Sequence, residues 1–383
     1  MRSPALLAAA ALVSTALATT VVPASGQPDR GAGRYIVVLK DGSAPGAVAR
    51  EHARAHGLDV GYVYRHAIHG YSAVIPQARL EELRDDDRVA FVEPDGVVTA
   101  AVGQPLPWGI DRVDAEKSST VAGDGLGAVT GVTVYVIDSG VDTAHQDLNV
   151  VGHVNFAGGS NKDCNGHGTH VASTIAAEDN ASDVVGVAPG APIVGVKVLG
   201  CNGSGSTSGV IRGIEWVTAN AKRPAIANMS LGGSYSKALN DAVTKSASSG
   251  IFYSLAAGND AKDACTSSPA SAGAGAVASN GIMTVGATDS ADREATFSNH
   301  GACVDIWAPG VGIPSTQKGG GTTTMSGTSM AAPHGAGAAA LYLSSHVSAG
   351  PSAIEAALKG ETVSPGTTSR DGRTITLLNV DMF

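Results

Sequence analysis

The chain has 383 residues and a formal net charge of −9; 50 residues are glycine and only 15% are charged. Its length exceeds one typical domain, so we expect two folded parts. Low charge and abundant glycine favour a compact, loop-rich globule and exclude a disordered chain. No cluster of Lys and Arg occurs, so neither nucleic acid nor an anionic membrane is expected as a partner.

The first residues have the three parts of an export signal. Arg2 precedes an apolar run from Ala5 to about Ala18, and the small residues Ala24-Ser25-Gly26 follow it. A membrane anchor is the alternative, but it would need roughly 18–20 apolar residues and no cleavage signal. Three threonines and a proline in or just after the run weaken that alternative (Thr15, Thr19, Thr20 and Pro23). We therefore expect a signal peptide over residues 1–24 and a secreted, extracellular product.

Residues 34–100 predict a small α+β domain. Three strands and two helices are expected there, at residues 35–39, 70–75 and 89–92 and at residues 47–56 and 78–84.

The larger part, residues 101–383, alternates strands with helices. Strands are expected at residues 132–137, 193–199, 225–229, 251–256 and 282–286, and helices at residues 169–177, 208–221, 237–248 and 328–345. This alternation predicts an α/β fold with a mainly parallel central sheet and helices on both faces. Sites in such sheets lie at the carboxyl ends of the strands, where Asp138 and Asn259 both fall.

Three short strings carry the residues of a nucleophilic catalyst. They are Asp138-Ser139-Gly140, Asn165-Gly166-His167-Gly168-Thr169-His170 and Gly327-Thr328-Ser329-Met330-Ala331-Ala332-Pro333-His334. Together they supply an acid, a base and a serine in the order Asp, His, Ser, which differs from the orders in chymotrypsin and in α/β-hydrolases. Taken singly, the tripeptide or the serine is a weak signal, because turns and helix caps often contain them. The combination resembles the subtilisin-type serine peptidases (subtilases), in the branch of proteinase K and aqualysin.

The resemblance extends from about Arg34 to the end of the chain. It implies a subtilisin-like fold and a secreted serine endopeptidase that cuts proteins and peptides through an acyl-enzyme. It assigns residues 25–100 to an inhibitory prosegment that also aids folding, with processing after Ala100, and residues 101–383 to the peptidase domain. An ordinary N-terminal binding module is the alternative for the first unit. We expect a monomer.

The resemblance also assigns the catalytic roles. A serine hydroxyl is a weak nucleophile that needs an adjacent base, so Ser329 is the expected nucleophile and His167 the expected base. His170 is the competitor, but the first histidine of this motif is the catalytic one in the family. Asp138 would hold the tautomer of His167. Asn259 is the expected oxyanion-hole donor, together with the backbone N–H of Ser329.

The resemblance implies two extended rims that take the peptide substrate as an added strand. The rims are Gly203-Ser204-Gly205 and Ser230-Leu231-Gly232, and the walls of the S1 pocket are Ala256, Ala257 and Gly258. These walls are small and uncharged, and no acidic residue is evident there. Broad specificity with apolar or aromatic P1 residues is therefore expected.

The four cysteines fit two disulfides in an exported chain, with three possible connectivities. Relatives pair them sequentially, which implies Cys164–Cys201 and Cys265–Cys303. A zinc site formed by Cys164, His167 and His170 is the alternative, but it lacks a fourth ligand.

Calcium is the one expected cofactor, because extracellular enzymes use this ion to fix loops. Asp305 matches a calcium-binding aspartate of proteinase K-like enzymes, although the loop at residues 270–281 looks expanded. Asp111 and Asp114 resemble an N-terminal calcium loop, but Ala115 stands where relatives have Gln. A solvated carboxylate is the alternative for each. No organic cofactor is expected.

Two other functions remain open on these observations. One is a subtilase-like binding protein without activity, against which the intact triad and Asn259 argue. The other is a lipase or esterase with the same triad, against which the paired peptide rims argue. Gly335 is unexplained: the family usually has Val there, and a glycine inside a helix costs ~1 kcal/mol relative to Ala.

Overall fold

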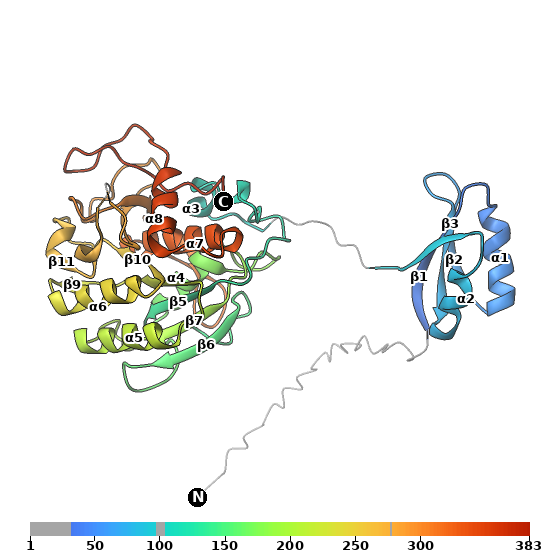
Figure 1. Cartoon of the computed structure of the whole chain (residues 1–383), viewed down its shortest axis with the longest axis horizontal. Helices are drawn as coiled ribbons and strands as arrows, with labels where there is room; N and C mark the ends of the chain where they lie inside the picture. The colour runs from blue at the N-terminus through green and yellow to red at the C-terminus, as the bar shows by residue number, and fades with distance from the viewer. Residues whose placement is uncertain (1–31, 97–103, 276–277) are drawn as a thin grey trace, which may run out of the picture. The chain divides into compact units, whose positions relative to one another are not determined.

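The computed structural model describes residues 32–96, 104–275 and 278–383. The chain divides into two compact units, Met1–Ala100 and Ala101–Phe383 (Figure 1). The expected signal peptide and the expected processing position at Ala100 lie outside the described residues. Within those three ranges, no helix combines the length and the apolar character needed to cross a bilayer.

The smaller unit is an antiparallel four-stranded sheet, in the order β2-β3-β1-β4, with two helices packed on it. Its elements are β1 (Ala32–Leu39), α1 (Pro45–His56), β2 (Asp59–Tyr64), β3 (Gly70–Pro76), α2 (Leu80–Arg84) and β4 (Val89–Pro94). Pro45 begins α1 and Gly57, with φ 68°, ends it. Apolar patterning predicted every element except β2, an edge strand without a buried residue.

The larger unit contains a seven-stranded sheet in which all neighbouring strands are parallel. The order is β13-β12-β10-β8-β5-β7-β6, formed by β5 (Thr133–Asp138), β6 (Val150–Asn155), β7 (Ile193–Lys197), β8 (Ala225–Met229), β10 (Ile251–Ala256), β12 (Ile282–Thr288) and β13 (Ile306–Pro309). The α/β class predicted from the strand-helix alternation is confirmed. The two edge strands were not predicted, because β6 has no fully buried residue and β13 is only four residues long.

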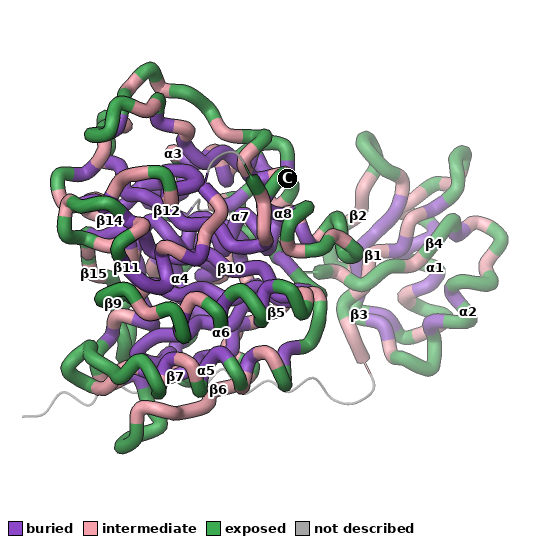
Figure 2. Tube along the Cα trace, turned by 60° about the vertical axis from the view of Figure 1, so that its left-hand side comes forward, coloured by how far each residue is buried: buried purple, intermediate pink, exposed green. Residues whose placement is uncertain are grey.

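Helices cover both faces of this sheet. On one face lie α4 (His167–Ala176), α7 (Thr328–Ser345) and α8 (Pro351–Gly360), and on the other lie α5 (Thr207–Asn220) and α6 (Lys237–Ser248). Successive side chains of β5 point to opposite faces of the sheet. Val134 and Val136 pack with α4, α7 and α8, whereas Tyr135 and Ile137 pack with α5 and α6. Figure 2 shows the buried residues concentrated along these strands and α7.

The strand order reverses beside β5. The chain adds β7 and β6 on one side of β5, and β8, β10, β12 and β13 on the other. Such a reversal leaves a crevice at the carboxyl ends of the strands in an open parallel sheet. Asp138 is the last residue of β5, and Ser230 directly follows β8, so both residues lie at this edge.

Helix α7 is buried along most of its length and contacts β8, β10, β12 and β13. A Cβ atom built at Gly335 would lie 2.6 Å from Met283 Cε and 2.9 Å from Ser254 Oγ. Both distances are shorter than non-bonded contacts allow. Gly335 therefore lets the helix approach the strands that carry Met283 and Ser254.

We predict that Gly335→Ala destabilises the protein although alanine favours helices. The added methyl group must displace Met283 and Ser254, and overpacking of this kind typically costs about 1–3 kcal/mol. A methyl group added at Gly360, in α8, would have no heavy atom within 4 Å, so Gly360→Ala should instead stabilise by up to about 1 kcal/mol. Thermal unfolding of both variants, each with Ser329→Ala to prevent self-digestion, measures the difference. Equal shifts in the two variants would contradict the packing explanation.

Candidate active site

Asp138 and His167 form a hydrogen-bonded pair at the end of β5. Asp138 is fully buried, and its Oδ1 atom accepts from Nδ1 of His167 at 2.8 Å and from the backbone N–H of Ser139 at 2.6 Å. Because an ionised carboxylate can only accept, the Nδ1 atom of His167 carries the proton. The Nε2 atom is then left with its lone pair as the basic position.

The loop before α4 is held by Asp163, a buried residue that the sequence motifs did not indicate. Its Oδ1 atom accepts from the backbone N–H of Asn165 and Gly166, and its Oδ2 atom accepts from the N–H and hydroxyl of Thr169. These contacts satisfy amides at the start of α4 that have no acceptor within the helix. Asp163 thereby fixes His167, the first residue of α4.

Ser139 connects this loop to the end of β5. Its hydroxyl donates to Asp163 Oδ1 at 3.0 Å and accepts from the N–H of Gly168 at 3.0 Å. A Cβ atom built at Gly168 would lie 2.0 Å from the carbonyl oxygen of Gly140. Only a glycine therefore permits the close approach of the two motifs that brings His167 to Asp138.

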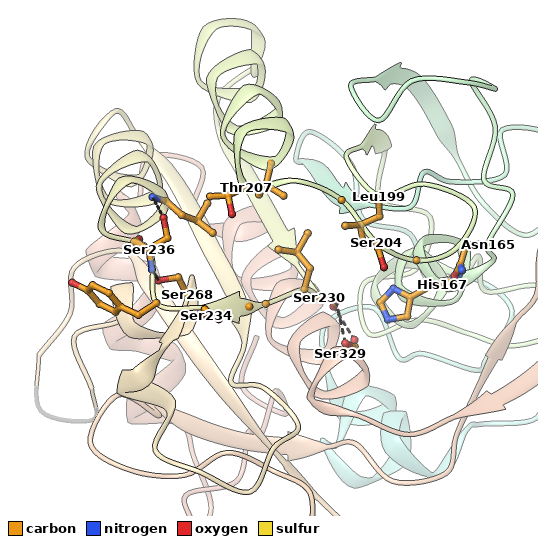
Figure 3. A pocket seen from close by; sticks show the side chains of 18 residues that line it. Asn165, His167, Leu199, Ser204, Thr207, Ser230, Ser234, Ser236, Ser268 and Ser329 are labelled. Atoms are coloured by element: carbon orange, nitrogen blue, oxygen red, sulfur yellow. Dashed lines mark hydrogen bonds between the residues drawn. The ribbon is translucent and has the colours of Figure 1, made fainter.

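Ser329 lies in the first turn of α7 and faces the same cavity as His167 (Figure 3). Its hydroxyl donates to the carbonyl of Ser230 at 3.1 Å, and the hydroxyl of Ser230 donates back to the carbonyl of Ser329 at 2.8 Å. In this rotamer the hydroxyl is not bonded to His167. Catalytic hydrogen bonds are often loose in unliganded enzymes and tighten when substrate binds.

Asn259 is oriented by Thr328, another residue whose role the motifs did not indicate. The Oδ1 atom of Asn259 accepts from the N–H of Thr328 at 2.8 Å and from its hydroxyl at 2.9 Å. Since a backbone N–H can only donate, the N–H of Thr328 requires the amide oxygen as its partner, and the side-chain amide cannot be flipped. Its Nδ2 group is therefore free to donate at the start of α7, beside Ser329.

The two histidines of the motif have opposite electrostatic environments. Burial lowers the pKa of His167, but the adjacent Asp138 carboxylate raises it by more, so the pKa lies above its ordinary value. Burial also lowers the pKa of His170, to about 4, and there no carboxylate opposes it. The Nε2 atom of His170 lies 3.2 Å from the carbonyl oxygen of Ile313, in the core. The structure therefore pairs His167 with Asp138 and keeps His170 away from the cleft.

The residues expected to bind substrate line two adjoining cavities. A cleft of about 640 Å³ is lined by both expected rims, His167 and Ser329, and the rims comprise Gly203, Ser204, Gly205, Ser230, Leu231 and Gly232. A neighbouring cavity of about 200 Å³ is lined by Ala256, Ala257, Gly258, Asn259 and Ser329.

An acidic residue, Asp260, also lines the smaller cavity, which the sequence did not indicate. Its side chain is 65% exposed and forms an ion pair with Lys262 at 3.0 Å. The charge therefore lies at the solvent-facing side of the cavity and is already paired.

Two disulfides connect the loops around the site. Cys164 is bonded to Cys201 and Cys265 to Cys303, which is the pairing that the resemblance implied. Because Cys164 is oxidised, the alternative of a zinc site with His167 and His170 is excluded. The first disulfide joins the loop that carries Asp163 to the rim that begins at Gly203.

The expected calcium ligands do not fit a calcium ion. Oδ1 of Asp305 lies 2.7 Å from the ammonium of Lys359, and Oδ2 accepts from the N–H of Thr284 at 2.6 Å. Asp114 contacts Lys117 and the side-chain amide of Asn379, and Asp111 is exposed. Calcium needs six to eight oxygen ligands. In the three described ranges, no group of three or more His, Cys, Asp or Glu side chains could hold a metal ion.

We predict that Asp138→Asn lowers the pKa of His167. The native imidazole should titrate above the ordinary value of about 6.5, so its neutral, basic form predominates only at higher pH. Removal of the carboxylate leaves the effect of burial, which favours the neutral form and moves the midpoint below 6.5. NMR titration of the imidazole resonances measures both midpoints, and His170 serves as an internal reference. An unchanged His167 midpoint in the variant would contradict the assigned pairing.

Comparison with known proteins identifies the family. The family model described as "Subtilase family" matches residues 129–373, and the model described as "Peptidase inhibitor I9" matches residues 34–101. The chain is 42% identical over 365 residues to "Extracellular serine proteinase" of Thermus sp. (strain Rt41A), covering 86% of this chain and 85% of that protein.

Two further proteins are similar to this chain, and the match covers different shares of their lengths. The chain is 46% identical over 319 residues to "Alkaline serine exoprotease A" of Vibrio alginolyticus, covering 79% of this chain but only 56% of that protein. A solved structure, of a cold adapted subtilisin-like serine proteinase, matches with a TM-score of 0.63 at 43% identity and covers 71% of this chain and 97% of its own. These matches confirm the resemblance inferred from the three motifs. The chain therefore belongs to the subtilase family of serine peptidases.

Proposed function

We propose that this subtilase is a secreted endopeptidase of broad specificity, synthesised as a precursor that processes itself. The observation that carries the proposal is that buried Asp138, from β5, pairs with His167, at the start of α4, and that His167 and Ser329, from α7, line one cleft. The Thermus relative, which is similar over most of both chains, is named an extracellular serine proteinase. That name supports secretion and protein substrates for this chain.

Acylation would begin when the Ser329 hydroxyl turns from the Ser230 carbonyl toward Nε2 of His167. The oxygen attacks the carbonyl carbon of the peptide bond while His167 takes the proton. The Asp138 carboxylate, still bonded to Nδ1, stabilises the imidazolium that forms. His167 then gives the proton to the leaving amine, and the acyl group stays on Ser329 until water, deprotonated by His167, hydrolyses the ester.

Asn259 would stabilise the negative charge that develops on the carbonyl oxygen. Its Nδ2 group is fixed as a donor by the contacts of Oδ1 with Thr328. The N–H of Ser329 belongs to the first turn of α7, where amides have no acceptor within the helix. Two such donors, already oriented, form an oxyanion hole without reorganisation during the reaction.

The substrate chain would lie along the 640 Å³ cleft, between the rims at residues 203–205 and 230–232. Its P1 side chain would enter the neighbouring 200 Å³ cavity. Ala256, Ala257 and Gly258 give that cavity a wall of small, uncharged residues, which supports a preference for apolar and aromatic P1 residues. All residues of the proposed site come from one chain, so a monomer is sufficient.

The match of residues 34–101 to an inhibitor family supports a prosegment that inhibits its own peptidase. We further propose that it aids folding and that the chain is cut after Ala100. Residues 97–100, which would occupy the cleft, lie outside the described residues.

Calcium binding is general among subtilases. Amine and amide donors contact Asp305 and Asp114 here. We assign neither position to calcium, and no step of the proposed reaction needs a metal.

We predict that the precursor cuts itself near Ala100 and then digests casein, whereas Ser329→Ala leaves the precursor whole. Mass spectrometry of the two purified precursors measures the processing. Asn259→Ala is the intermediate case, because loss of one oxyanion donor should slow the reaction about 10²–10³-fold while the triad remains. Cutting of the Ser329→Ala precursor at that junction would reject self-processing. Activity on short esters without activity on casein would favour an esterase instead.

A further inference from the structure

The ammonium of Lys359 lies in a cage of oxygen atoms behind the smaller cavity. It donates to the backbone carbonyls of Gly275 at 2.8 Å and Ala278 at 2.6 Å. It also pairs with Oδ1 of Asp305 at 2.7 Å and with Oε1 of Glu355 at 2.5 Å. Two carbonyls and two carboxylates are the ligand types that calcium takes in proteins, yet here they surround a covalently attached cation.

The two carboxylates of the cage are buried, and the ion pair with Lys359 is the contact made by Oδ1 of Asp305. Both side chains have 0% exposure, whereas that of Lys359 has 12%. The second oxygen of Glu355 accepts from the N–H of Asn280 and Gly281, each at 2.7 Å, and the second oxygen of Asp305 accepts from the N–H of Thr284. Removing a cation from two buried carboxylates would leave uncompensated charge, which is strongly destabilising.

Helix α8 supplies the cation. Glu355 and Lys359 are four residues apart, so both side chains project from the same face of the helix. Glu355 binds the backbone that leads into β12, and Lys359 reaches past it to the carbonyls of the preceding loop. One face of α8 therefore contacts the backbone at Gly275 and Ala278 and at the start of β12.

We infer that Lys359 is the resident cation of this site: its ammonium holds the backbone at Gly275 and Ala278 in place of a calcium ion. The expectation of calcium at Asp305 came from the resemblance to enzymes with a calcium-binding aspartate at that position. In this chain the ammonium of Lys359, which a chelator cannot remove, occupies that position. This role of Lys359 concerns stability and does not depend on the proposed catalytic function.

The cage also supports one wall of the proposed S1 pocket. The hydroxyl of Thr284 donates to the carbonyl of Ala270 at 2.8 Å, and Ala270 lines the smaller cavity. The N–H of the same threonine donates to Asp305. Weakening the contacts of Lys359 should therefore also displace the pocket wall, because Thr284 connects Asp305 with Ala270.

Calcium binding and thermal unfolding of the full chain test this assignment. Ser329→Ala is present in every sample to prevent self-digestion. Lys359→Met keeps most of the aliphatic stem and removes the charge. Its unfolding midpoint in EDTA should fall by on the order of 10 °C. Millimolar calcium should raise the midpoint of Lys359→Met by more than it raises the midpoint of the native chain. Lys237→Met is the matched control, because Lys237 forms an exposed pair with Asp241, also four residues apart.

A second variant keeps the test decisive if Lys359→Met does not fold. Equilibrium dialysis against calcium gives the number of ions bound by the native chain and by Asp305→Asn. Equal numbers are expected, because Asp305 binds no calcium while Lys359 is present. One ion fewer in Asp305→Asn would overturn the inference. A Lys359→Met midpoint in EDTA equal to that of Lys237→Met would overturn it as well.

Discussion

The hydrogen bond between the buried Asp138 carboxylate and His167 determines how the active-site end of the sheet is arranged. A carboxylate removed from water is costly unless donors and positive charge compensate it. Ser139 and His167 supply the donors at 2.6 and 2.8 Å, and the buried ammonium of Lys197 bonds to the carbonyls of Ser139 and Leu199 below them. Burial lowers the pKa of Lys197, while Asp163 and Asp138 act in the opposite direction. The acid, the base and this internal cation therefore depend on one another.

The topology of the sheet places that interaction beside the other residues of the site. The strand order reverses between β5 and β8, so Asp138 and Ser230 lie at the same crevice although the chain makes a long excursion between them. Two helices then begin at this edge: α4 with His167 as its first residue and α7 with Ser329 in its first turn. Close packing at Gly168 and Gly335 sets how near each helix comes to the sheet.

The sequence predicted the parts of this fold whose residues are buried on a regular period. Strands β5, β8 and β10 are mostly apolar and almost entirely buried, and they were found within a residue or so. The edge strands β2 and β6 have no buried residue and showed no pattern. The candidate triad and Asn259 were predicted because they lie in short strings with a strong family resemblance.

The residues that position them were not predicted, because their roles exist only in three dimensions. Asp163 and Thr328 make ordinary hydrogen bonds whose importance depends on which loops they join. The contacts of Asp305 were not predicted for the same reason. Its partner, Lys359, belongs to a helix that the sequence did not reveal, and the pairing arises from the packing of α8 on β12.

Labelling with a fluorophosphonate tests most directly whether these distant residues activate one serine. The reagent reacts with an activated serine hydroxyl and leaves ordinary serines unmodified. Mass spectrometry of the digested, processed enzyme should find a single modified residue, Ser329, and His167→Ala should abolish the modification. An unlabelled Ser329 in folded protein, or labelling that persists without His167, would contradict the account.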